Sequence, residues 1–186
     1  MYGILYCITK IVVTALIRVL PVEFFNRLCL VLPGRLIQHG LRQLGASIGE
    51  NVKFMPPVVF HNFSDHHASA FRNLTIGNNC FFGRNSFFDV QCPIIIRDNV
   101  SIAMGVMLIT HTDVGASPLK QGYLPSTKAA IVIGEGAYIG ARATVLQGVE
   151  VGREAIIGAG ALVRKPVPDH TVWGGVPARQ IGTVRK

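Results

Sequence analysis

Residues 131–164, with the sequence IVIGEGAYIGARATVLQGVEVGREAIIGAGALVR, decide the fold of this chain. An aliphatic residue recurs there at every sixth position, and a glycine directly follows four of these residues. The six aliphatic positions are Ile133, Ile139, Val145, Val151, Ile157 and Val163. No helix has a period of six residues, so the pattern predicts a chain that turns a corner every six residues and points one side chain inward each time. We therefore expect a β-solenoid.

The same spacing continues upstream in three shorter phrases. Their members are Ile48, Phe54 and Phe60, then Ile76, Phe82 and Phe88, then Ile96, Ile102 and Leu108. The count slips between successive phrases, which predicts loops that leave the solenoid at about residues 61–75, 89–95 and 109–132. The repeat thus accounts for most of the chain as one domain of 186 residues.

Charge and hydropathy indicate the kinds of partner. Residues are 49% hydrophobic and only 15% charged, and we expect the apolar excess to serve subunit contacts, membrane contact or both. The net charge of +8 lies at the two ends: residues 1–45 carry five basic side chains against one acidic, and residues 153–186 carry six against two. This placement predicts a membrane surface at one end and a phosphorylated ligand at the other, with a solvated basic surface as the alternative.

Two other classes are disfavoured by what the composition lacks. No long basic run or basic–aromatic interleaving occurs, which argues against nucleic acid as a partner. The four cysteines show no CxxC and no zinc spacing, so we interpret them as reduced packing residues of a cytosolic protein.

The N-terminal segment, residues 1–32, is rich in Leu, Ile, Val and Phe. Lys10 and Arg18 interrupt it and Pro21 should break a helix, so a membrane span does not fit well. A signal peptide fits poorly because the start lacks a basic region and no small-x-small cleavage site follows. Two short amphipathic helices, roughly 3–19 and 22–31, fit better. They would either anchor the protein at the membrane interface or cover the open end of the solenoid, and one segment could do both.

The repeat, the THTD sequence at 110–113 and the GGVPAR sequence at 174–179 together resemble the hexapeptide-repeat acyltransferases. Within that family the chain is most similar to the maltose, galactoside and polysaccharide O-acetyltransferase group. The resemblance covers about residues 45–182, after a helical segment at 1–44 and before a tail at 183–186. It implies an all-β solenoid, a left-handed parallel β-helix, assembled as a homotrimer with CoA-type ligands bound between adjacent subunits.

The resemblance assigns the acceptor side of the site. Transfer of an acyl group to a hydroxyl needs a base, and an imidazole titrates in the right range. His111 stands at the position of the family's general base for direct attack on acetyl-CoA. Asn85 corresponds to an asparagine that contacts the acceptor sugar, although a plain corner asparagine is the alternative. Asp113 is a candidate to orient the imidazole or to bind acceptor hydroxyls.

The donor side is also assigned by resemblance. Small residues would let the pantetheine arm approach the backbone, and cations would bind the nucleotide phosphates. Trp173 would either stack on CoA or close the end of the prism. The matching positions are Ala141, Ala159, Gly160, Arg164, Lys165, Trp173 and Arg179.

The histidines at 61, 66 and 67 raise the question of zinc, because the same fold hosts γ-class carbonic anhydrases. His111 has no histidine partner nearby in the sequence, so we expect no metal. The resemblance implies an acetyl-CoA-dependent O-acetyltransferase that acetylates a sugar hydroxyl in surface polysaccharide or glycan biosynthesis. We expect it in the cytoplasm or at the inner face of the membrane, with an acceptor that could be lipid-linked. The alternatives are acetylation of a small hydroxylated molecule, N-acylation of an amino sugar, or a non-catalytic scaffold.

Overall fold

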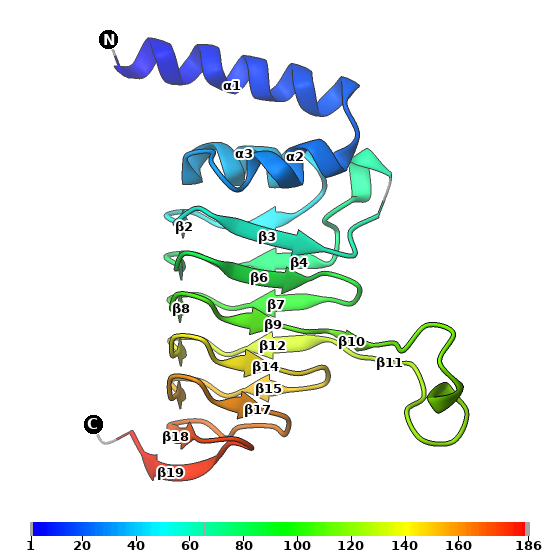
Figure 1. Ribbon diagram of the computed structural model, residues 1–186. Coiled ribbons are helices and arrows are strands. Elements are labelled where there is room, and N and C mark those ends of the chain that lie inside the picture. Colours follow the sequence, from blue (N-terminus) through cyan, green and yellow to red (C-terminus); the bar gives the residue numbers. More distant parts are fainter. Residues whose placement is uncertain (1, 65, 185–186) are drawn as a thin grey trace.

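The computed structural model describes residues 2–64 and 66–184, and its main body is a stack of coils with short strands in three sheets (Figure 1). The first sheet consists, in spatial order, of β1 (Ser47–Ile48), β4 (Leu74–Ile76), β7 (Ile94–Ile96), β12 (Ile131–Ile133) and β15 (Glu150–Val151). The second consists of β2 (Lys53–Phe54), β5 (Phe81–Phe82), β8 (Ser101–Ile102), β13 (Tyr138–Ile139), β16 (Ile156–Ile157), β18 (Thr171–Gly174) and β19 (Arg179–Thr183). The third consists of β3 (Val58–His61), β6 (Ser86–Asp89), β9 (Met107–Leu108), β14 (Thr144–Val145) and β17 (Leu162–Val163).

Neighbouring strands in these sheets are parallel, except that β19 pairs antiparallel with β18 at the last edge. Each coil therefore hydrogen-bonds to the coil before it and to the coil after it. The arrangement fits the left-handed parallel β-helix that the sequence predicted, with a short helical segment at its N-terminal end (Figure 1).

The hexad positions form the core of this stack. All six hexad residues of the 131–164 stretch are fully buried. Register explains why: Ile133 pairs with Ile96 of the preceding coil and with Val151 of the following one, so equivalent side chains stack on each other. In the upstream phrases aromatic rings take these positions in the second and third sheets, and the ring centroids of Phe54 and Phe82, paired in the second sheet, lie 4.7 Å apart.

Glycines follow the hexad positions because successive coils approach each other closely there. A Cβ atom on Gly140 would lie 2.6 Å from the carbonyl oxygen of Ile157 and 2.6 Å from the amide nitrogen of Ala159, both backbone atoms of the next coil. At Gly158, near the end of the stack, the nearest atom would be 3.4 Å away, an ordinary contact. The repeat of glycine is thus a packing requirement of stacked coils.

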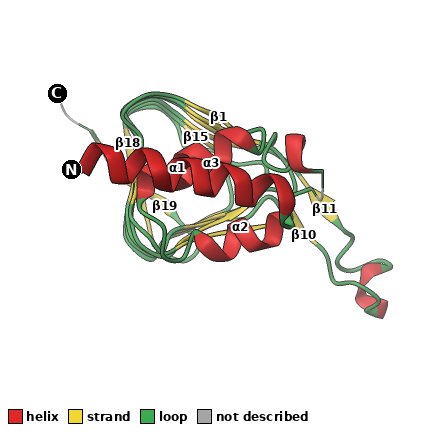
Figure 2. Cartoon of the chain, turned by 90° about the horizontal axis from the view of Figure 1, so that it is seen from above, coloured by secondary structure: helices red, strands yellow, loops and turns green. Residues whose placement is uncertain are grey.

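The N-terminal segment forms three helices, not the two expected. They are α1 (Tyr2–Val19), α2 (Val22–Leu28) and α3 (Gly34–Gln43). Two of them, α2 and α3, lie against the first coil, and α1 lies over these two (Figure 1 and Figure 2). The sequence analysis missed α3 and extended the second helix to residue 31. Helix α3 contains two glycines, which weaken its helix signal in the sequence. Gly34 lies against the Phe54 carbonyl and Gly40 against the Phe25 ring, where a Cβ would clash. Leu36, Ile37 and Leu41 bury the inner face of α3.

The helical segment therefore covers the end of the stack, one of the two roles expected for it. The outer face of α1 is left apolar, with Ile11 69% and Val19 80% exposed. Among the described residues, no helix combines the length and apolarity that crossing a bilayer requires.

One of the three expected loops is wrong. The chain does leave the stack between β3 and β4, where the short 3-10 helix η1 (His67–Ser69) lies, and again after β9. The segment at 89–95 does not leave it. Only four residues separate β6 from β7, the same number as between β14 and β15. The slip in the repeat there, eight residues from Phe88 to Ile96 in place of six, comes from one additional strand residue on each side of the corner, Asp89 in β6 and Ile94 in β7.

Candidate active site

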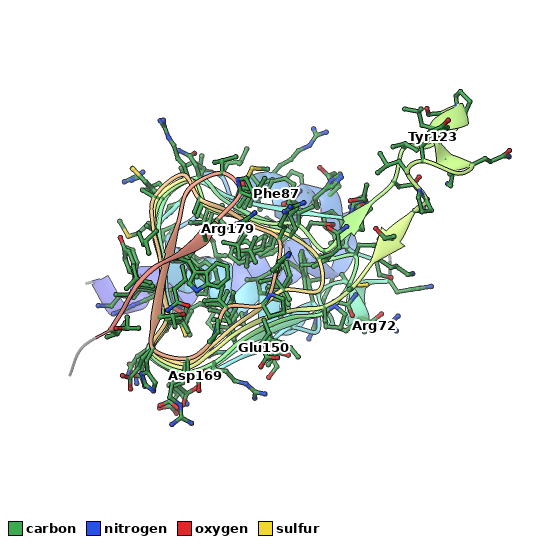
Figure 3. The ribbon with its side chains drawn as sticks, turned by 90° about the horizontal axis from the view of Figure 1, so that it is seen from below. Arg72, Phe87, Tyr123, Glu150, Asp169 and Arg179 are labelled. Carbon is green, nitrogen blue, oxygen red and sulfur yellow. The ribbon has the colours of Figure 1, made fainter. Side chains whose placement is uncertain are left out.

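The candidate site lies where the chain leaves the third sheet after β9. His111 begins β10 (His111–Thr112), which pairs antiparallel with β11 (Thr127–Lys128). The segment between them contains the 3-10 helix η2 (Pro118–Lys120) and projects well beyond the stack, with Tyr123 in its outer part (Figures 1 and 3). The expected excursion at 109–132 is therefore a two-stranded arm, and His111 stands at its root.

The imidazole of His111 is held by Asp89. Its Nδ1 lies 2.6 Å from Oδ2 of Asp89, whose side chain is 1% exposed. Phe88 pairs with Leu108 across adjacent coils, so Asp89 lies beside the chain just before it reaches His111. A carboxylate that accepts a hydrogen bond from Nδ1–H leaves the lone pair on Nε2. The imidazole is thus fixed in the tautomer that a general base needs, and 29% of its side chain is exposed.

Asp89 is kept ionised by the other groups around it. Oδ1 accepts a hydrogen bond from Nδ2 of Asn62 at 2.8 Å, and Oδ2 accepts one from the Thr110 amide at 2.8 Å. Burial would raise the pKa of this carboxyl, but the hydrogen bonds from Asn62, His111 and Thr110 outweigh burial and hold the pKa below its ordinary value. Asp89 is therefore a carboxylate at neutral pH.

An open pocket of about 220 Å³ lies beside His111. Each residue that lines it carries a polar group, and the set includes hydroxyl, amide, carboxylate, ammonium and imidazole groups. The lining residues are Gln91, His111, Thr112, Asp113, Ser126, Thr127 and Lys128. Such groups bind a hydroxylated molecule by hydrogen bonds and leave room for it next to the imidazole.

Gln147 fastens the root of the arm to the next coil. Its Nε2 donates to Oγ1 of Thr112 at 2.9 Å and to Oγ1 of Thr127 at 3.1 Å, one hydroxyl on each strand of the arm. The side-chain oxygen of Gln147 is buried with no hydrogen-bond partner within the described part of the chain. Sequence reasoning missed Gln147, because a glutamine in a coil corner carries no motif.

Asp113 does not hold the imidazole. Its carboxylate accepts hydrogen bonds from the Gly115 amide at 2.9 Å and from Nζ of Lys120 at 3.1 Å. These contacts, with a third from the Ser126 side chain, lower its pKa to about 2. It organises a turn in the arm and stands at the edge of the pocket, so a contact with acceptor hydroxyls stays a prediction. Asp89, which the sequence analysis did not select, orients His111 instead.

Asn85 lies far from His111 of its own chain. It precedes β6, whereas Asp89 ends that strand, so the two lie at opposite ends of β6 and on different corners of the stack. Its φ of +60° matches the left-handed φ values of Gly105, Arg142 and Gly160, which take the same corner in later coils. This geometry explains an asparagine by the turn alone. Its predicted contact with the acceptor would need the edge of a second subunit.

The small residues predicted for the donor, Ala141, Ala159 and Gly160, lie on the same corner of the stack as Asn85. The Gly160 amide donates to the Ala141 carbonyl at 2.8 Å, which places the corners of two coils directly on each other. Ala159 is exposed there and Ala141 partly so. Together they form a narrow shelf of backbone and methyl groups.

The predicted cations lie elsewhere. Arg164 and Lys165 follow β17, on the corner of the stack where the chain departs toward His111, and both are exposed. Arg179 begins β19 at the last coil, which faces the viewer in Figure 3. Trp173 packs against the core and donates from Nε1 to Oγ1 of Thr171 at 3.1 Å, so it closes the end of the stack.

Of the three histidines considered for zinc, His67 has a side chain outside the described part of the structure. No group of three or more His, Cys, Asp or Glu side chains is placed to hold a metal ion among the side chains that the structure describes. His61 instead lies against Phe87, with ring centroids 5.9 Å apart.

Comparison with known proteins adds independent support for the fold and the repeat. Residues 130–165 match the bacterial transferase hexapeptide family, and residues 73–109 match the hexapeptide repeat of succinyl-transferase. The galactoside O-acetyltransferase of Escherichia coli K12 is 34% identical over 142 residues, which cover 76% of this chain and 65% of that protein. The serine acetyltransferase of the same strain is 39% identical over 100 residues, which cover 54% of this chain and 35% of that protein.

The aligned part is thus less than two thirds of the length of either relative. Among solved structures, a galactoside acetyltransferase in complex with coenzyme A superimposes with a TM-score of 0.73 at 25% identity. That superposition covers 88% of this chain and 78% of the other.

Proposed function

The chain belongs to the hexapeptide-repeat acyltransferase family, as its sequence predicted, and from this premise we propose that it is an acetyl-CoA-dependent O-acetyltransferase acting on a sugar hydroxyl. The observation that carries the proposal is the His111–Asp89 pair, which opens into a polar pocket at the root of the arm. Coenzyme A bound to a galactoside acetyltransferase of the same fold supports acetyl-CoA as the donor. The left-handed winding of the coils is part of the same proposal.

His111 performs the chemistry in two proton transfers. Nε2 accepts the proton of the acceptor hydroxyl as its oxygen bonds to the thioester carbonyl carbon, which acetyl-CoA supplies when bound. Asp89 stabilises the imidazolium that forms, since its carboxylate is already ionised and bonded to Nδ1. The carbon–sulfur bond then breaks, and the imidazolium returns the proton to the leaving sulfur. The products are an acetyl ester and CoA with a free thiol.

A complete site needs two subunits in this proposal. His111, Arg164 and Lys165 follow strands of the third sheet and lie on one corner of the stack. Asn85 and the shelf at Ala141 precede strands of that sheet and lie on another corner. One chain cannot bring both corners to one ligand, but one corner of a chain can meet the other corner of a neighbouring chain. This division supports a homotrimer with its sites between subunits.

Replacing Ala159 with phenylalanine is expected to raise the KM for acetyl-CoA at least ~10-fold, because a ring would fill the shelf that admits the pantetheine arm. Ala159 is exposed, so the fold should tolerate the ring. Steady-state kinetics with varied acetyl-CoA measures the effect, and Ala68→Phe, an exposed alanine near η1, is the matched control. An unchanged KM in Ala159→Phe would remove the shelf from the donor site.

Three alternative functions make different predictions for the same assay. An amino-sugar N-acyltransferase would release thiol from acetyl-CoA only with amine acceptors, and a small-molecule O-acetyltransferase only with non-glycan alcohols. A scaffold would neither release thiol nor bind CoA. Measuring CoA binding directly, in a sample that shows no turnover, separates a missing acceptor from a missing activity.

We also infer peripheral contact with an anionic membrane at its inner face, where a lipid-linked glycan acceptor would be found. The support is the exposed apolar face of α1, flanked by Lys10 and Arg18. An Ile11→Ser/Val12→Ser variant is expected to lose flotation with anionic vesicles. The control is Ile181→Ser/Val176→Ser, which changes two similarly exposed apolar residues at the other end of the stack. Equal flotation of both variants would contradict the contact.

A further inference from the structure

A basic cleft of about 560 Å³ lies at the N-terminal end of the molecule, between α1, α3 and β2. Four cations and a histidine line it, and no carboxylate does in the described structure. These five residues are Lys10, Arg35, His39, Arg42 and Lys53. Like charges gathered in a concave surface repel one another, so the arrangement is favourable only when an anion or counterions neutralise it.

Arg42 is positioned without being neutralised. Its Nε and Nη2 donate to the Ile48 carbonyl at 3.1 and 3.0 Å, and Nη2 donates to the Gly49 carbonyl at 2.6 Å. These acceptors are neutral, so the guanidinium keeps its full charge at a fixed place. Lys10, Arg35 and Lys53 are exposed, and none of them forms an ion pair with any described residue.

His39 completes the set of donors. The Thr14 hydroxyl donates to the Lys10 carbonyl at 2.9 Å, so at 2.7 Å from Nε2 of His39 it must act as the acceptor. Nε2 therefore carries the hydrogen, and Nδ1 is left for a proton or a ligand. Burial, together with the charges of Lys10 and Arg42, lowers the pKa of His39. An anion in the cleft would oppose the effect of those charges.

We propose that this cleft binds the phosphoryl group of a phosphorylated organic molecule. A phosphoryl group carries one or two negative charges and accepts several hydrogen bonds, which suits a guanidinium fork with two lysines and an imidazole around it. Tyr6 and Met55 also line the cleft and give apolar surface for the organic part. The nucleotide phosphates of CoA do not explain the cleft, since Arg164, Lys165 and Arg179 lie toward the opposite end of the stack (Figure 1).

The test is a titration of the full-length protein with pyrophosphate, followed by calorimetry and by NMR of the His39 ring. We expect saturable binding, a rise in the pKa of His39 on binding, and tighter binding as the pH falls through the range of that shift. The charged or titratable groups that face His39 are Tyr6 and Lys10 on α1, Arg35 and Arg42 on α3, and Lys53 on β2. All of these except Tyr6 are cationic at neutral pH, and a nearby cation lowers the pKa of a histidine. A rise in the pKa of His39 during the titration would therefore come from the bound anion.

Two double variants make the result specific. Arg35→Gln/Lys53→Gln should raise the dissociation constant at least ~10-fold. Arg72→Gln/Arg97→Gln removes the same charge from exposed sites outside the cleft and should leave it within about 2-fold. Equal weakening by both variants would mean nonspecific attraction and would overturn the proposal, as would the absence of any binding.

A second arm identifies the source of the phosphoryl group. Vesicles of phosphatidylcholine, with and without anionic phosphatidylglycerol, are added to the same proteins. Saturation by pyrophosphate with the shift at His39 assigns the cleft to a free phosphorylated molecule. Binding to anionic vesicles alone, lost in Arg35→Gln/Lys53→Gln, assigns it to a lipid headgroup. Acetyl transfer to a free sugar does not involve the cleft, so its outcome and that of this test are independent.

Discussion

Replacing His111 with alanine is expected to lower the turnover of acetyl-CoA about 10²–10⁴-fold, the usual cost of losing a general base. The imidazole is the group that both touches the open pocket and is held in a fixed tautomer, by Asp89 at 2.6 Å. Without it, an acceptor hydroxyl must lose its proton to water. Its methyl replacement leaves the backbone of β10 free to pair with β11 as before.

Thiol release from acetyl-CoA, measured against a panel of sugars and glycan fragments, is the assay for this variant. His66→Ala, which removes an exposed imidazole from a loop, is the matched control and should keep wild-type turnover. CoA binding to His111→Ala should also be retained, since the imidazole is assigned to proton transfer and not to the donor. Wild-type turnover by His111→Ala would show that this residue is not the base.

Replacing Asp89 with asparagine is expected to lower turnover by a similar factor, about 10²–10⁴, although Asp89 does not face the pocket. Asparagine is neutral and cannot stabilise the imidazolium that forms during transfer. It can also donate a hydrogen bond to Nδ1, which would favour the tautomer that lacks a lone pair on Nε2. A purely structural role would lower the amount of folded enzyme but would leave the pH–rate profile unchanged, whereas loss of the carboxylate should shift it.

The same substitution predicts a pH dependence of stability. The pKa of Asp89 is lower in the folded chain than its unfolded value of about 3.9, so its contribution is fully present above that value and is lost as the pH falls through the folded pKa. Urea unfolding should show Asp89→Asn less stable by about 1–3 kcal/mol at neutral pH, with the gap narrowing in acid. Glu150→Gln, at an exposed position, should show no such gap. A gap that stays constant into acid would contradict the role assigned to the carboxylate.

The sequence predicted the stack well because the stack is a local property of the repeat. Each hexad position needs only its own coil and the next one, so Ile133 or Val151 reports its burial through spacing alone. The root of the arm was predicted for the same reason, because the six-residue repeat is interrupted after Leu108 and His111 follows.

The parts that could not be predicted depend on contacts between segments that share no period. Helix α3 contains two glycines that serve the packing of Phe25 and Phe54, and glycine weakens any helix signal. Asp89 contacts His111 only because one coil returns the chain to the same corner of the stack 22 residues later. A signal for this was present: Asp89 directly follows Phe88, the hexad partner of Leu108. A carboxylate one coil before a candidate base is therefore worth seeking in a repeat of this kind.

The two ends of the stack are closed by unlike elements, helix α3 over the first coil and the antiparallel strand β19 beside the last. A parallel coil offers the same ladder of amides and carbonyls above and below, so nothing within the repeat itself limits how many coils can follow one another. If either closure were removed, the bare coil of one molecule would match the bare coil of the next. The terminal elements thus set the length of the particle and keep separate molecules from joining end to end into filaments.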